Sequence, residues 1–379
     1  MKILFITQLF PYEFGNKYTS SALREFVDEW GRKGHQVKVI RPHYRYEREK
    51  FPPVSKFKIG DNIEVEFIRP IRVPLLKSSF YSHRKILRSL DFKPDIIICH
   101  LYNSYFTFHK LASKLAVPLV IGIHSSDTRI AEVSHHWRHQ DRIFGNASAF
   151  ACRSHSLQNR FSKLFPQYSD KTFIAPSGIP KEYLQDFSKR REQKGRTKII
   201  TVTHLIKRKQ VDVVLNILAS LQSTYDFEFT IIGSGVELNA LKRQAKTLGL
   251  EKKVIFKGQL GRNEVITAML QSDIFMLPSY RETLGLVYLE AMACGCITIG
   301  AENEGIDGIL RNGENGFLCD ATKPDNIKLA LIKAMELPAN ARKNMRNKAL
   351  ATIKAYNTEE QADKYLEQMR KICNDYNKA

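Results

Sequence analysis

The feature that most constrains this chain of 379 residues is an alternation of short apolar runs with longer segments of helical periodicity. The opening shows the pattern: Lys2–Thr7 is mostly apolar, helical periodicity covers Thr19–Lys33, Gly34 ends it, and Gln36–Pro42 is apolar again. Short apolar strands separated by helices are typical of βαβ units with a parallel sheet. We therefore predict a doubly wound α/β fold.

The pattern occurs twice, with a polar and strongly basic interruption between the two series. The interruption, Lys189–Lys198 (KRREQKGRTK), lacks the apolar residues of a core strand and is typical of an interdomain linker. The first series contains the expected strands Lys2–Thr7, Gln36–Pro42, Asp95–Cys99, Pro118–Ile123, Ala149–Cys152 and Thr172–Ala175. The second contains the expected strands Lys198–Val202, Phe227–Ile232, Val254–Lys257, Ile274–Leu277, Ile297–Gly300 and Phe317–Cys319, with helices at Asp212–Ser220, Glu237–Thr247 and Leu286–Ala293. We predict two Rossmann-like domains, residues 1–188 and 189–355, and a final helix at Thr358–Asn377.

The positive charge is concentrated in the first half of the chain. The protein has 59 Lys and Arg against 39 Asp and Glu, a net charge of +20. Residues 1–200 hold 35 basic and 18 acidic side chains, which leaves 24 and 21 for residues 201–379. This asymmetry indicates an anionic partner for the first domain, either nucleic acid or an anionic membrane face, with a simple gain in solubility as the alternative.

Cysteine usage and hydropathy indicate a cytoplasmic protein. The six cysteines are scattered, no CxxC pair could bind zinc or exchange thiols, and such usage is typical of a reducing compartment. The apolar stretch Ile3–Phe10 is too short and too interrupted for a signal peptide, so we expect a first strand there. We expect no membrane-spanning helix, because no run of about 18 apolar residues occurs. The length and the 43% share of hydrophobic residues exclude a collagen, a disulfide knot and a disordered polyelectrolyte.

The densest group of chemistry-bearing residues is the segment PSYRETLGLVYLEAMACG, residues 278–295. An apolar strand ends at Leu277, a polar loop follows, and a helix begins near Leu286. Backbone N–H groups at such a helix start, with Gly285 allowing close approach, form an anion site suited to a diphosphate. Glu282 in the loop and Glu290 about one turn inside the helix are placed to address opposite ends of one ligand. Solvated surface carboxylates are the alternative.

This segment resembles the Glu-x7-Glu signature of the family-four retaining glycosyltransferases, also called glycosyl transferases group 1, which have the GT-B fold. Other motifs follow in the family's order: GHQV from Gly34, IHSSD from Ile123, PSGI from Pro176, THLIKRK from Thr203, IGSG from Ile232, Gly258, and MLPS from Met276. The resemblance covers nearly the whole chain. It implies two Rossmann-like domains whose parallel sheets face a central cleft, with residues 356–379 crossing back onto the first domain.

The resemblance also implies roles for individual residues. Glu282 would bind hydroxyls of the donor sugar, Glu290 the nucleotide ribose and Lys209 the diphosphate. His124 would lie beside the transferring sugar, so that Glu282, His124 and Lys209 are the implied catalytic residues. The other implied donor-binding residues are His204, Arg208, Gly15, Gly233, Gly235, Thr283, Leu284, Gly285 and Leu286, and the acceptor-side candidates are Asn16 and Asp127. We interpret Gly233 and Gly235 as letting the chain pass close to the nucleotide base.

Four positions depart from the family's pattern. The family's first diphosphate arginine is His204 here, which weakens one contact or hands its role to Lys207 or Arg208. The other departures are Gly15-Asn16 for a double glycine, Pro180 for an acidic residue and Cys296 for a proline. None of them touches the two glutamates or Lys209.

Two further clusters of side chains are candidate binding sites. His135 and His136, with His139 nearby, have no carboxylate or cysteine at ligand spacing, so we expect neither a metal nor another cofactor. Residues 68–90 interleave basic with apolar and aromatic side chains and contain no acid, which is typical of a patch on an anionic bilayer, with an ordinary solvated loop and helix as the alternative. The same interleaving suits nucleic acid, but no known nucleic-acid module is visible and we expect no such partner.

Together these observations predict a retaining glycosyltransferase that moves a hexose from a UDP- or GDP-sugar to a saccharide or lipid-linked acceptor. Its expected setting is cell-surface polysaccharide, lipopolysaccharide or glycolipid biosynthesis, in the cytoplasm and peripheral on the inner membrane face. No residue stands out as a covalent nucleophile, so we favour same-face attack. The alternative enzymes are a GT-B sugar-nucleotide epimerase or phosphorylase. A nucleic-acid-binding protein that uses the basic domain, and an inactive family member that serves as a scaffold, are the alternatives of another class.

Overall fold

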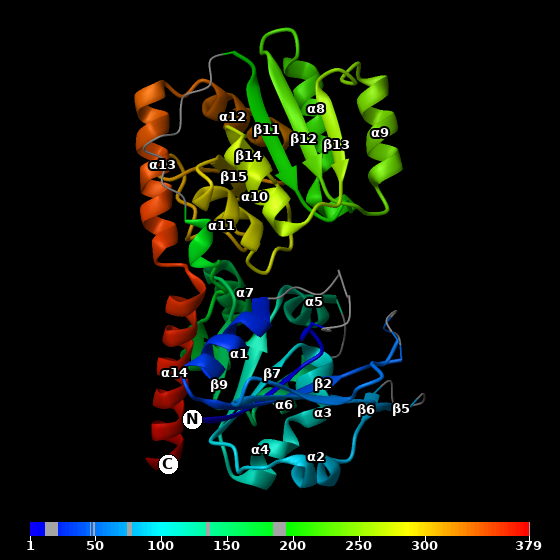
Figure 1. The fold of residues 1–379 in the computed structure, drawn as a ribbon, viewed down its shortest axis with the longest axis vertical. Coiled ribbons are helices and arrows are strands. Elements are labelled where there is room, and N and C mark those ends of the chain that lie inside the picture. The colour runs from blue at the N-terminus through cyan, green and yellow to red at the C-terminus, as the bar shows by residue number, and fades with distance from the viewer. Residues whose placement is uncertain are drawn as a thin grey trace. The chain divides into compact units, whose positions relative to one another are not determined.

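The chain folds into two compact units, each built on its own α/β sheet (Figure 1). The computed structural model describes residues 1–11, 22–45, 47, 50–73, 78–133, 137–184 and 195–378. Unit 1 contains Met1–Gly178 and Thr358–Ala379, and unit 2 contains Ile179–Asn357. The expectation of two Rossmann-like α/β units is confirmed. The division between the units falls after Gly178, whereas the sequence-based boundary lies at residue 188. The predicted linker stays a prediction, because residues 185–194 lie outside the described part of the chain.

The sheet of unit 1 has eight strands in the order β10-β9-β8-β7-β1-β2-β4-β3. Its strands are β1 (Lys2–Thr7), β2 (Gln36–Pro42), β3 (Lys56–Ile59), β4 (Ile63–Ile68), β7 (Ile96–His100), β8 (Leu119–Ile123), β9 (Ala149–Cys152) and β10 (Thr172–Ile174). All neighbours are parallel except β3, which pairs antiparallel with β4 at the edge. The strand order reverses between β1 and β7, and ligands of open α/β sheets bind at such a switch point, beyond the carboxyl ends of the strands.

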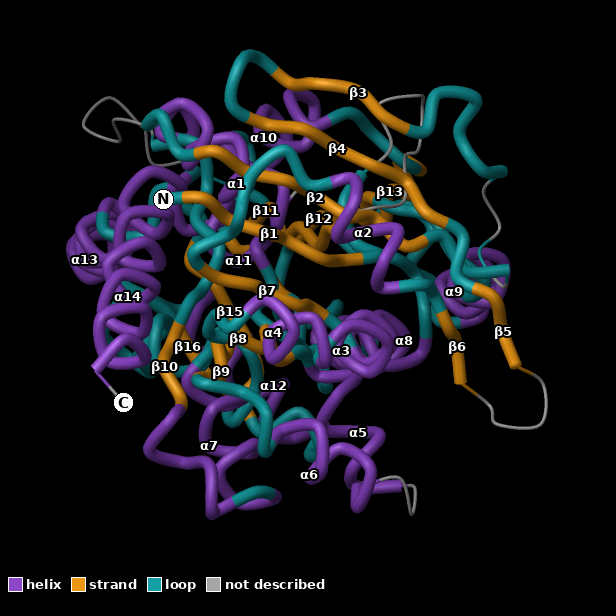
Figure 2. The backbone as a smooth tube through the Cα atoms, turned by 90° about the horizontal axis from the view of Figure 1, so that it is seen from below, coloured by secondary structure: helices purple, strands orange, loops and turns teal. Residues whose placement is uncertain are grey.

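Helices cover both faces of this sheet. They are α1 (Ala22–Arg32), α2 (His83–Ser89), α3 (Tyr102–Phe108), α4 (Lys110–Leu115), α5 (Ser125–Val133), α6 (Trp137–Phe144), α7 (His155–Leu164) and α14 (Thr358–Lys378). Ile3 and Phe5 pack under α1 and α14, while Leu4 and Ile6 pack under α3 and α4. Figure 2 shows α1 and α3 on opposite sides of β1. This alternation follows from the period of two along a strand, and it makes β1 a buried strand with two apolar faces.

The final helix α14 belongs to unit 1, as the resemblance implied. Trp30 of α1 donates from its indole N–H to the carbonyl oxygen of Ala362, at 3.1 Å. Tyr365 meets Phe26 and Trp30 edge to face, with ring centroids 5.4 Å apart in both pairs. Each buried aromatic side chain of this kind contributes about 2 kcal/mol or more, so α14 is part of the core of unit 1.

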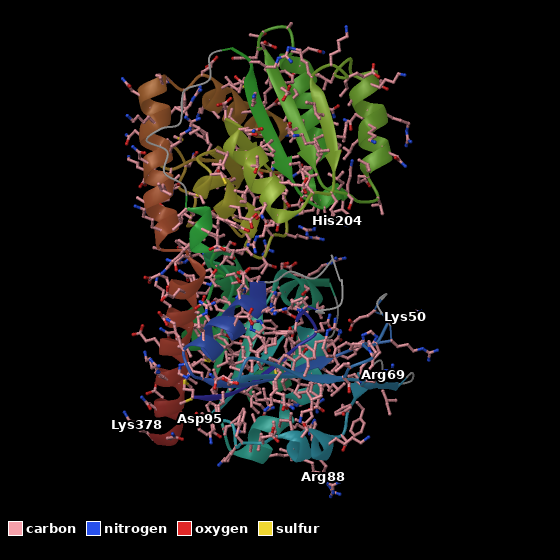
Figure 3. All side chains as sticks on the ribbon, viewed as in Figure 1. Lys50, Arg69, Arg88, Asp95, His204 and Lys378 are labelled. Atoms are coloured by element: carbon pink, nitrogen blue, oxygen red, sulfur yellow. The ribbon has the colours of Figure 1, made fainter. Side chains whose placement is uncertain are left out.

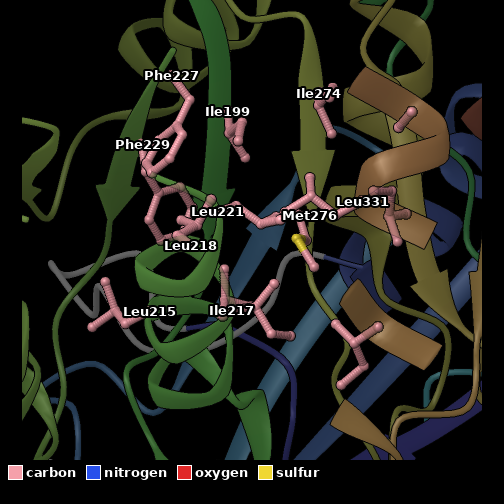
Figure 4. Close-up of a cluster of buried hydrophobic side chains, with 14 of the residues drawn as sticks. Ile199, Leu215, Ile217, Leu218, Leu221, Phe227, Phe229, Ile274, Met276 and Leu331 are labelled. Carbon is pink, nitrogen blue, oxygen red and sulfur yellow. The ribbon is translucent and has the colours of Figure 1, made fainter. Parts of the chain in front are cut away.

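The sheet of unit 2 has six parallel strands in the order β13-β12-β11-β14-β15-β16. Its strands are β11 (Thr197–Val202), β12 (Phe227–Ile232), β13 (Val254–Gly258), β14 (Ile274–Met276), β15 (Ile297–Ala301) and β16 (Phe317–Cys319). Its helices are α8 (Val211–Leu221), α9 (Leu238–Thr247), α10 (Arg262–Leu270), α11 (Leu286–Ala293), α12 (Pro324–Met335) and α13 (Ala339–Lys354). Leucines of α8, including Leu218 and Leu221, pack against Phe227 and Phe229 (Figure 4). The switch point of this sheet lies between β11 and β14.

The stretch from 56 to 90 differs from the sequence-based expectation. β3, β4 and a small hairpin of β5 (Ile71–Val73) and β6 (Ser78–Phe80) were not predicted. Within the predicted membrane patch, Ile68 ends β4 and is 3% exposed, and Ile86 of α2 is 1% exposed. The patch is therefore not a continuous surface feature, because these two side chains belong to the core. Residues 74–77, and the side chains of the residues flanking them in β5 and β6, lie outside the description.

Candidate functional site

The loops that follow β11 and β14 meet at the switch point of unit 2. After β11, residues Lys207–Lys209 form a short 3-10 turn that ends at Gln210 in a left-handed conformation, φ 55°. The Gln210 side-chain amide donates to the carbonyl oxygen of Pro278, at 2.7 Å, directly after β14. The backbone N–H of Tyr280 donates to the carbonyl oxygen of Arg208, at 3.2 Å. These bonds hold the basic turn against the loop that carries Glu282.

The buried carboxylate of Glu282 is the centre of this site. Its Oε1 accepts hydrogen bonds from Arg208 Nη1 at 2.8 Å, from Ser279 Oγ at 2.6 Å and from Lys209 Nζ. Glu282 and Lys209 are each 9% exposed, and Ser279 is fully buried. Burial alone would raise the pKa of Glu282, but Lys209 and Arg208 outweigh burial and hold it below its ordinary value. The cluster is therefore an ionised carboxylate with two cations beside it, linked by charge-assisted hydrogen bonds.

The 3-10 turn points Lys207 and Arg208 in different directions. These two residues were the sequence-based replacements for the family's first diphosphate arginine, whose position is His204 here. Lys207 extends away from the cluster, and its Nζ pairs with Asp212 at 2.5 Å. Arg208 extends into the cluster and contacts Glu282. His204 stands exposed just beyond the carboxyl end of β11 (Figure 3). Of Lys207 and Arg208, it is thus Arg208 that lies beside Lys209.

Helix α11 begins at Leu286, as predicted, and Glu290 lies in its second turn. Its N-cap residue, Gly285, has a left-handed backbone, φ 81°, and the helix has no side-chain cap. A helix start of this kind leaves backbone N–H groups for an anion. Glu290 pairs through Oε1 with Arg262 Nη2, at 3.3 Å. The adjoining Thr283 and Leu284 complete the loop between Glu282 and the helix.

Two residues of the site were missed by the sequence reasoning. Ser279 lies inside the motif that was singled out, and its hydroxyl donates to Glu282. Glu304 is far along the chain, and its Oε2 accepts the backbone N–H of Glu282, at 2.8 Å. No local spacing connects Glu304 to the motif, so only the fold reveals this contact.

Gly233 and Gly235 have a structural reason that does not involve a ligand. A Cβ atom on Gly233 would lie 1.8 Å from the carbonyl oxygen of Thr203, and one on Gly235 would lie 2.2 Å from that of Leu205. The N–H of Leu205 also donates to the carbonyl oxygen of Ser234, at 2.9 Å. The glycines let the loops after β11 and β12 touch backbone to backbone, next to His204.

In unit 1, His124 and Asp127 lie where β8 passes into α5. Oδ2 of Asp127 accepts the backbone N–H of His124 at 2.8 Å, and the Tyr105 hydroxyl donates to Oδ1 at 3.4 Å. Asp127 is only 2% exposed, and burial raises its pKa to about 7. Its carboxyl group thus bonds to groups of its own chain and holds the backbone at His124, which is itself half-buried.

Two other sequence predictions fall outside the described residues. Gly15 and Asn16 belong to residues 12–21, which the structure does not describe, and the same holds for His135, His136 and the side chain of His139. Within the described part of the chain, no group of three or more His, Cys, Asp or Glu side chains could hold a metal ion. In the same part, no helix is both long and apolar enough to cross a bilayer.

Comparison with known proteins assigns both halves of the chain. Residues 20–183 match the family model described as Glycosyltransferase Family 4, and residues 183–352 match the model described as Glycosyl transferases group 1. The chain belongs to the family-four glycosyltransferases. Within this family it is 32% identical to N-acetyl-alpha-D-glucosaminyl L-malate synthase of Bacillus anthracis, over 38% of each chain. It is 27% identical to the GDP-mannose-dependent alpha-(1-6)-phosphatidylinositol monomannoside mannosyltransferase of Mycolicibacterium smegmatis, over 53% of this chain and 56% of that protein. The aligned regions thus span 38% and 56% of the length of these two relatives.

Solved structures show that this family member has the GT-B fold. Sucrose-phosphate synthase from Thermosynechococcus elongatus superposes with a TM-score of 0.76, over 98% of each chain at 16% identity. Anabaena HepE, solved with UDP and glucose, superposes with a TM-score of 0.72, over 98% of this chain and 100% of that one at 18% identity. At these identities the likeness establishes the fold alone.

Proposed function

We propose that this protein transfers a hexose from a nucleotide-diphosphate sugar to a saccharide or lipid-linked acceptor, with retention of configuration. The observation that carries the proposal is the cluster of Glu282, Lys209 and Arg208 at the switch point of unit 2. A leaving diphosphate requires fixed positive charge and oriented N–H groups where its charge develops. Lys209, Arg208 and the uncapped start of α11 supply both within one loop region. A UDP- or GDP-sugar is the expected donor, since a relative is named for GDP-mannose and a fold neighbour was solved with UDP.

The residues divide the work as follows. Lys209 and Arg208 bind the diphosphate, Glu282 accepts hydrogen bonds from hydroxyls of the transferred sugar, and Glu290 binds the nucleotide ribose. Without a donor, both cations pair with Glu282, whose single negative charge offsets one of the two positive charges, so these three side chains retain one net positive charge. In the transfer step the acceptor oxygen bonds to the anomeric carbon on the face that the diphosphate leaves. The acceptor's proton passes to an oxygen of that diphosphate. The cations supply the charge stabilisation, so we expect no metal requirement.

Substitution of Arg208 tests the donor site. We expect Arg208→Gln to weaken UDP or GDP binding by about tenfold or more, since a hydrogen bond to a charged group contributes about 1.5–3 kcal/mol. Lys207→Gln is the matched control, because it removes the same charge one residue away, where Nζ pairs with Asp212. It should change the dissociation constant by less than about threefold at moderate ionic strength. Calorimetric titration with UDP, GDP and their sugars measures both variants, and equal losses for the two would contradict the assignment.

We also propose that unit 1 rests on an anionic membrane face through β5, β6 and α2. Ile71 and Phe80 are direct cross-strand partners, yet they are 70% and 61% exposed. The neighbouring helix α2 has no acidic residue in its first turn and exposes Arg84, Lys85 and Arg88. Figure 3 labels Arg88 on this helix. Apolar side chains flanked by cations suit an interface with anionic lipid, where each cation contributes about 1 kcal/mol.

Cosedimentation with vesicles tests this surface. We expect the protein to bind vesicles rich in phosphatidylserine at low salt and to be released at high salt, because the attraction is screened. Replacing Arg84, Lys85 and Arg88 by Gln should abolish binding. The control replaces Lys343, Lys348 and Lys354 by Gln, which changes the net charge equally through exposed residues of α13. Equal loss in both triple variants would show that only net charge matters and would refute a local docking surface.

A further inference from the structure

A second histidine, His100, contacts the ring of His124 in unit 1. His100 is the last residue of β7, pairs in register with Gly122 of β8, and is completely buried. Its Nδ1 lies 3.0 Å from Nε2 of His124. The two rings meet edge to face at 73°, with centroids 5.3 Å apart. This geometry is that of a hydrogen bond between two imidazoles.

Both imidazoles are neutral at physiological pH. Burial lowers the pKa of His100 well below its ordinary value, and the nearby His124 and Arg153 lower it further. Burial and Arg153 also lower the pKa of His124, to about 3. A hydrogen bond between two neutral imidazoles contains one proton, so one ring donates and the other accepts.

The surroundings of His100 decide which ring donates. Within the described part of the chain, its other nitrogen, Nε2, is buried and has no partner. A buried N–H without a partner is rarer in proteins than an acceptor without one. The proton of His100 therefore resides on Nδ1 and is donated to His124. Since Nε2 of His124 accepts this bond, the neutral His124 carries its own proton on Nδ1.

The packing around His100 fixes its ring in this position. A Cβ atom on Gly122 would lie 2.0 Å from His100 Nδ1, so the missing side chain at residue 122 creates the space for the imidazole. The ring of Phe5 lies with its centroid 5.3 Å from that of His100. Asp127 accepts the His124 backbone N–H at 2.8 Å. The donor ring and the backbone of the acceptor ring are thus both held.

We propose that His100 is a positioning residue that fixes the tautomer of His124, so that His124 presents an N–H donor at Nδ1 to the substrate. This role rests on the proposed function and on the place beside the transferring sugar that the family resemblance implies for His124. A sugar hydroxyl oxygen accepts a hydrogen bond from such an N–H. In this tautomer Nδ1 has no lone pair with which to remove a proton. His124 therefore acts as a hydrogen-bond donor, and the acceptor's proton goes to the leaving diphosphate.

Imidazole ¹⁵N chemical shifts test the tautomers without reference to activity. The full-length protein, with its 11 histidines ¹⁵N-labelled, should show His100 and His124 each protonated on Nδ1 and unprotonated on Nε2, with no titration between pH 6 and 8. Spectra of His100→Asn and His124→Asn assign the two signals. An Nε2-protonated His124 would overturn the proposal even if no variant could be studied further.

Two substitutions of His100 separate positioning from packing. The amide N–H of His100→Asn occupies roughly the place of imidazole Nδ1–H, so kcat should stay within about threefold of the unsubstituted enzyme. His100→Phe keeps an aromatic ring but donates no bond, which lets His124 take the other tautomer. We expect its kcat to fall by about tenfold or more, with the KM for the donor changed by less than about threefold. Equal activity of the Asn and Phe variants would refute the proposal.

The two readouts also separate this inference from the proposed function. Transfer of hexose together with the opposite tautomers would refute the role of His100 and leave the proposed function standing. The expected tautomers without transfer from any nucleotide sugar would refute the proposed function and, with it, the catalytic purpose of the His100 contact. Kinetic measurements use folded protein, checked by the melting temperature of each variant.

Discussion

Glu282→Gln should lower kcat by about 10²–10³, the loss expected when one preorganised charged contact to the transition state is removed. Glutamine has the same shape and still accepts a hydrogen bond from Ser279, so the variant should fold. It lacks the negative charge with which Glu282 pairs with Lys209 and Arg208 in the free protein. The diphosphate then no longer competes with Glu282 for these cations, and UDP or GDP should bind at least as tightly as before. Turnover with labelled nucleotide sugar and calorimetry with the nucleotide measure the two effects separately.

A fall in kcat without a loss of nucleotide affinity would distinguish a role of Glu282 in the reaction from general damage to the donor site. Glu251→Gln is the control, since Glu251 is exposed in unit 2 and its substitution should leave kcat within about twofold. Near-normal turnover of Glu282→Gln would contradict its place in the reaction. Incubation of the unsubstituted enzyme with the nucleotide sugar alone also distinguishes an epimerase, which would isomerise the sugar without an acceptor.

Gly233→Ala should destabilise unit 2 by about 3–5 kcal/mol, the upper end of effects for single substitutions. Its backbone has φ 135°, which residues with a side chain rarely adopt, and the new Cβ would lie 1.8 Å from the carbonyl oxygen of Thr203. That neighbour is backbone of the loop after β11, so relief of the overlap requires the loop to move. We expect the melting temperature to fall by about 10 °C, given about 2–4 °C per kcal/mol for a unit of this size.

Gly249→Ala provides the comparison for this substitution. Gly249 also has a positive φ, 68°, but a Cβ there meets nothing within 4 Å. The Gly249→Ala substitution should lower the free energy of unfolding by only about 1 kcal/mol, which is the cost of placing a side chain at a positive φ. Differential scanning calorimetry of the two variants separates backbone strain from overlap. A similar small loss for both would show that the loops after β11 and β12 do not require contact between their backbones.

Periodicity and local motifs were enough to predict most strands of the two large sheets and the start of helix α11. Most of the parallel strands are short runs rich in apolar residues, and α11 begins at Leu286 because Gly285 ends the polar loop before it. β4 was missed although Ile63–Ile68 alternates buried with half-buried residues, because Glu64 and Glu66 interrupt its apolar run. β3 was missed because Lys56 and Lys58 alternate with apolar residues on a short edge strand.

The parts of the site that were not predicted depend on contacts between distant segments. Arg208 and Lys207 are adjacent and both positively charged, and only the fold shows that Arg208 reaches Glu282 while Lys207 pairs with Asp212. Glu304 reaches the backbone of Glu282 from beyond β15. His100 was within reach of the reasoning that found His124, because both follow the last apolar residue of a strand.

The position of α14 has a consequence for biosynthesis. All of unit 2 precedes residue 358, so its chain is complete when α14 has yet to leave the ribosome. Unit 1 at that moment lacks Tyr365, and its partners Phe26 and Trp30 of α1 stand without the ring that covers them. The second unit is therefore able to fold first, while the unit that begins the chain waits for the last helix to close its core.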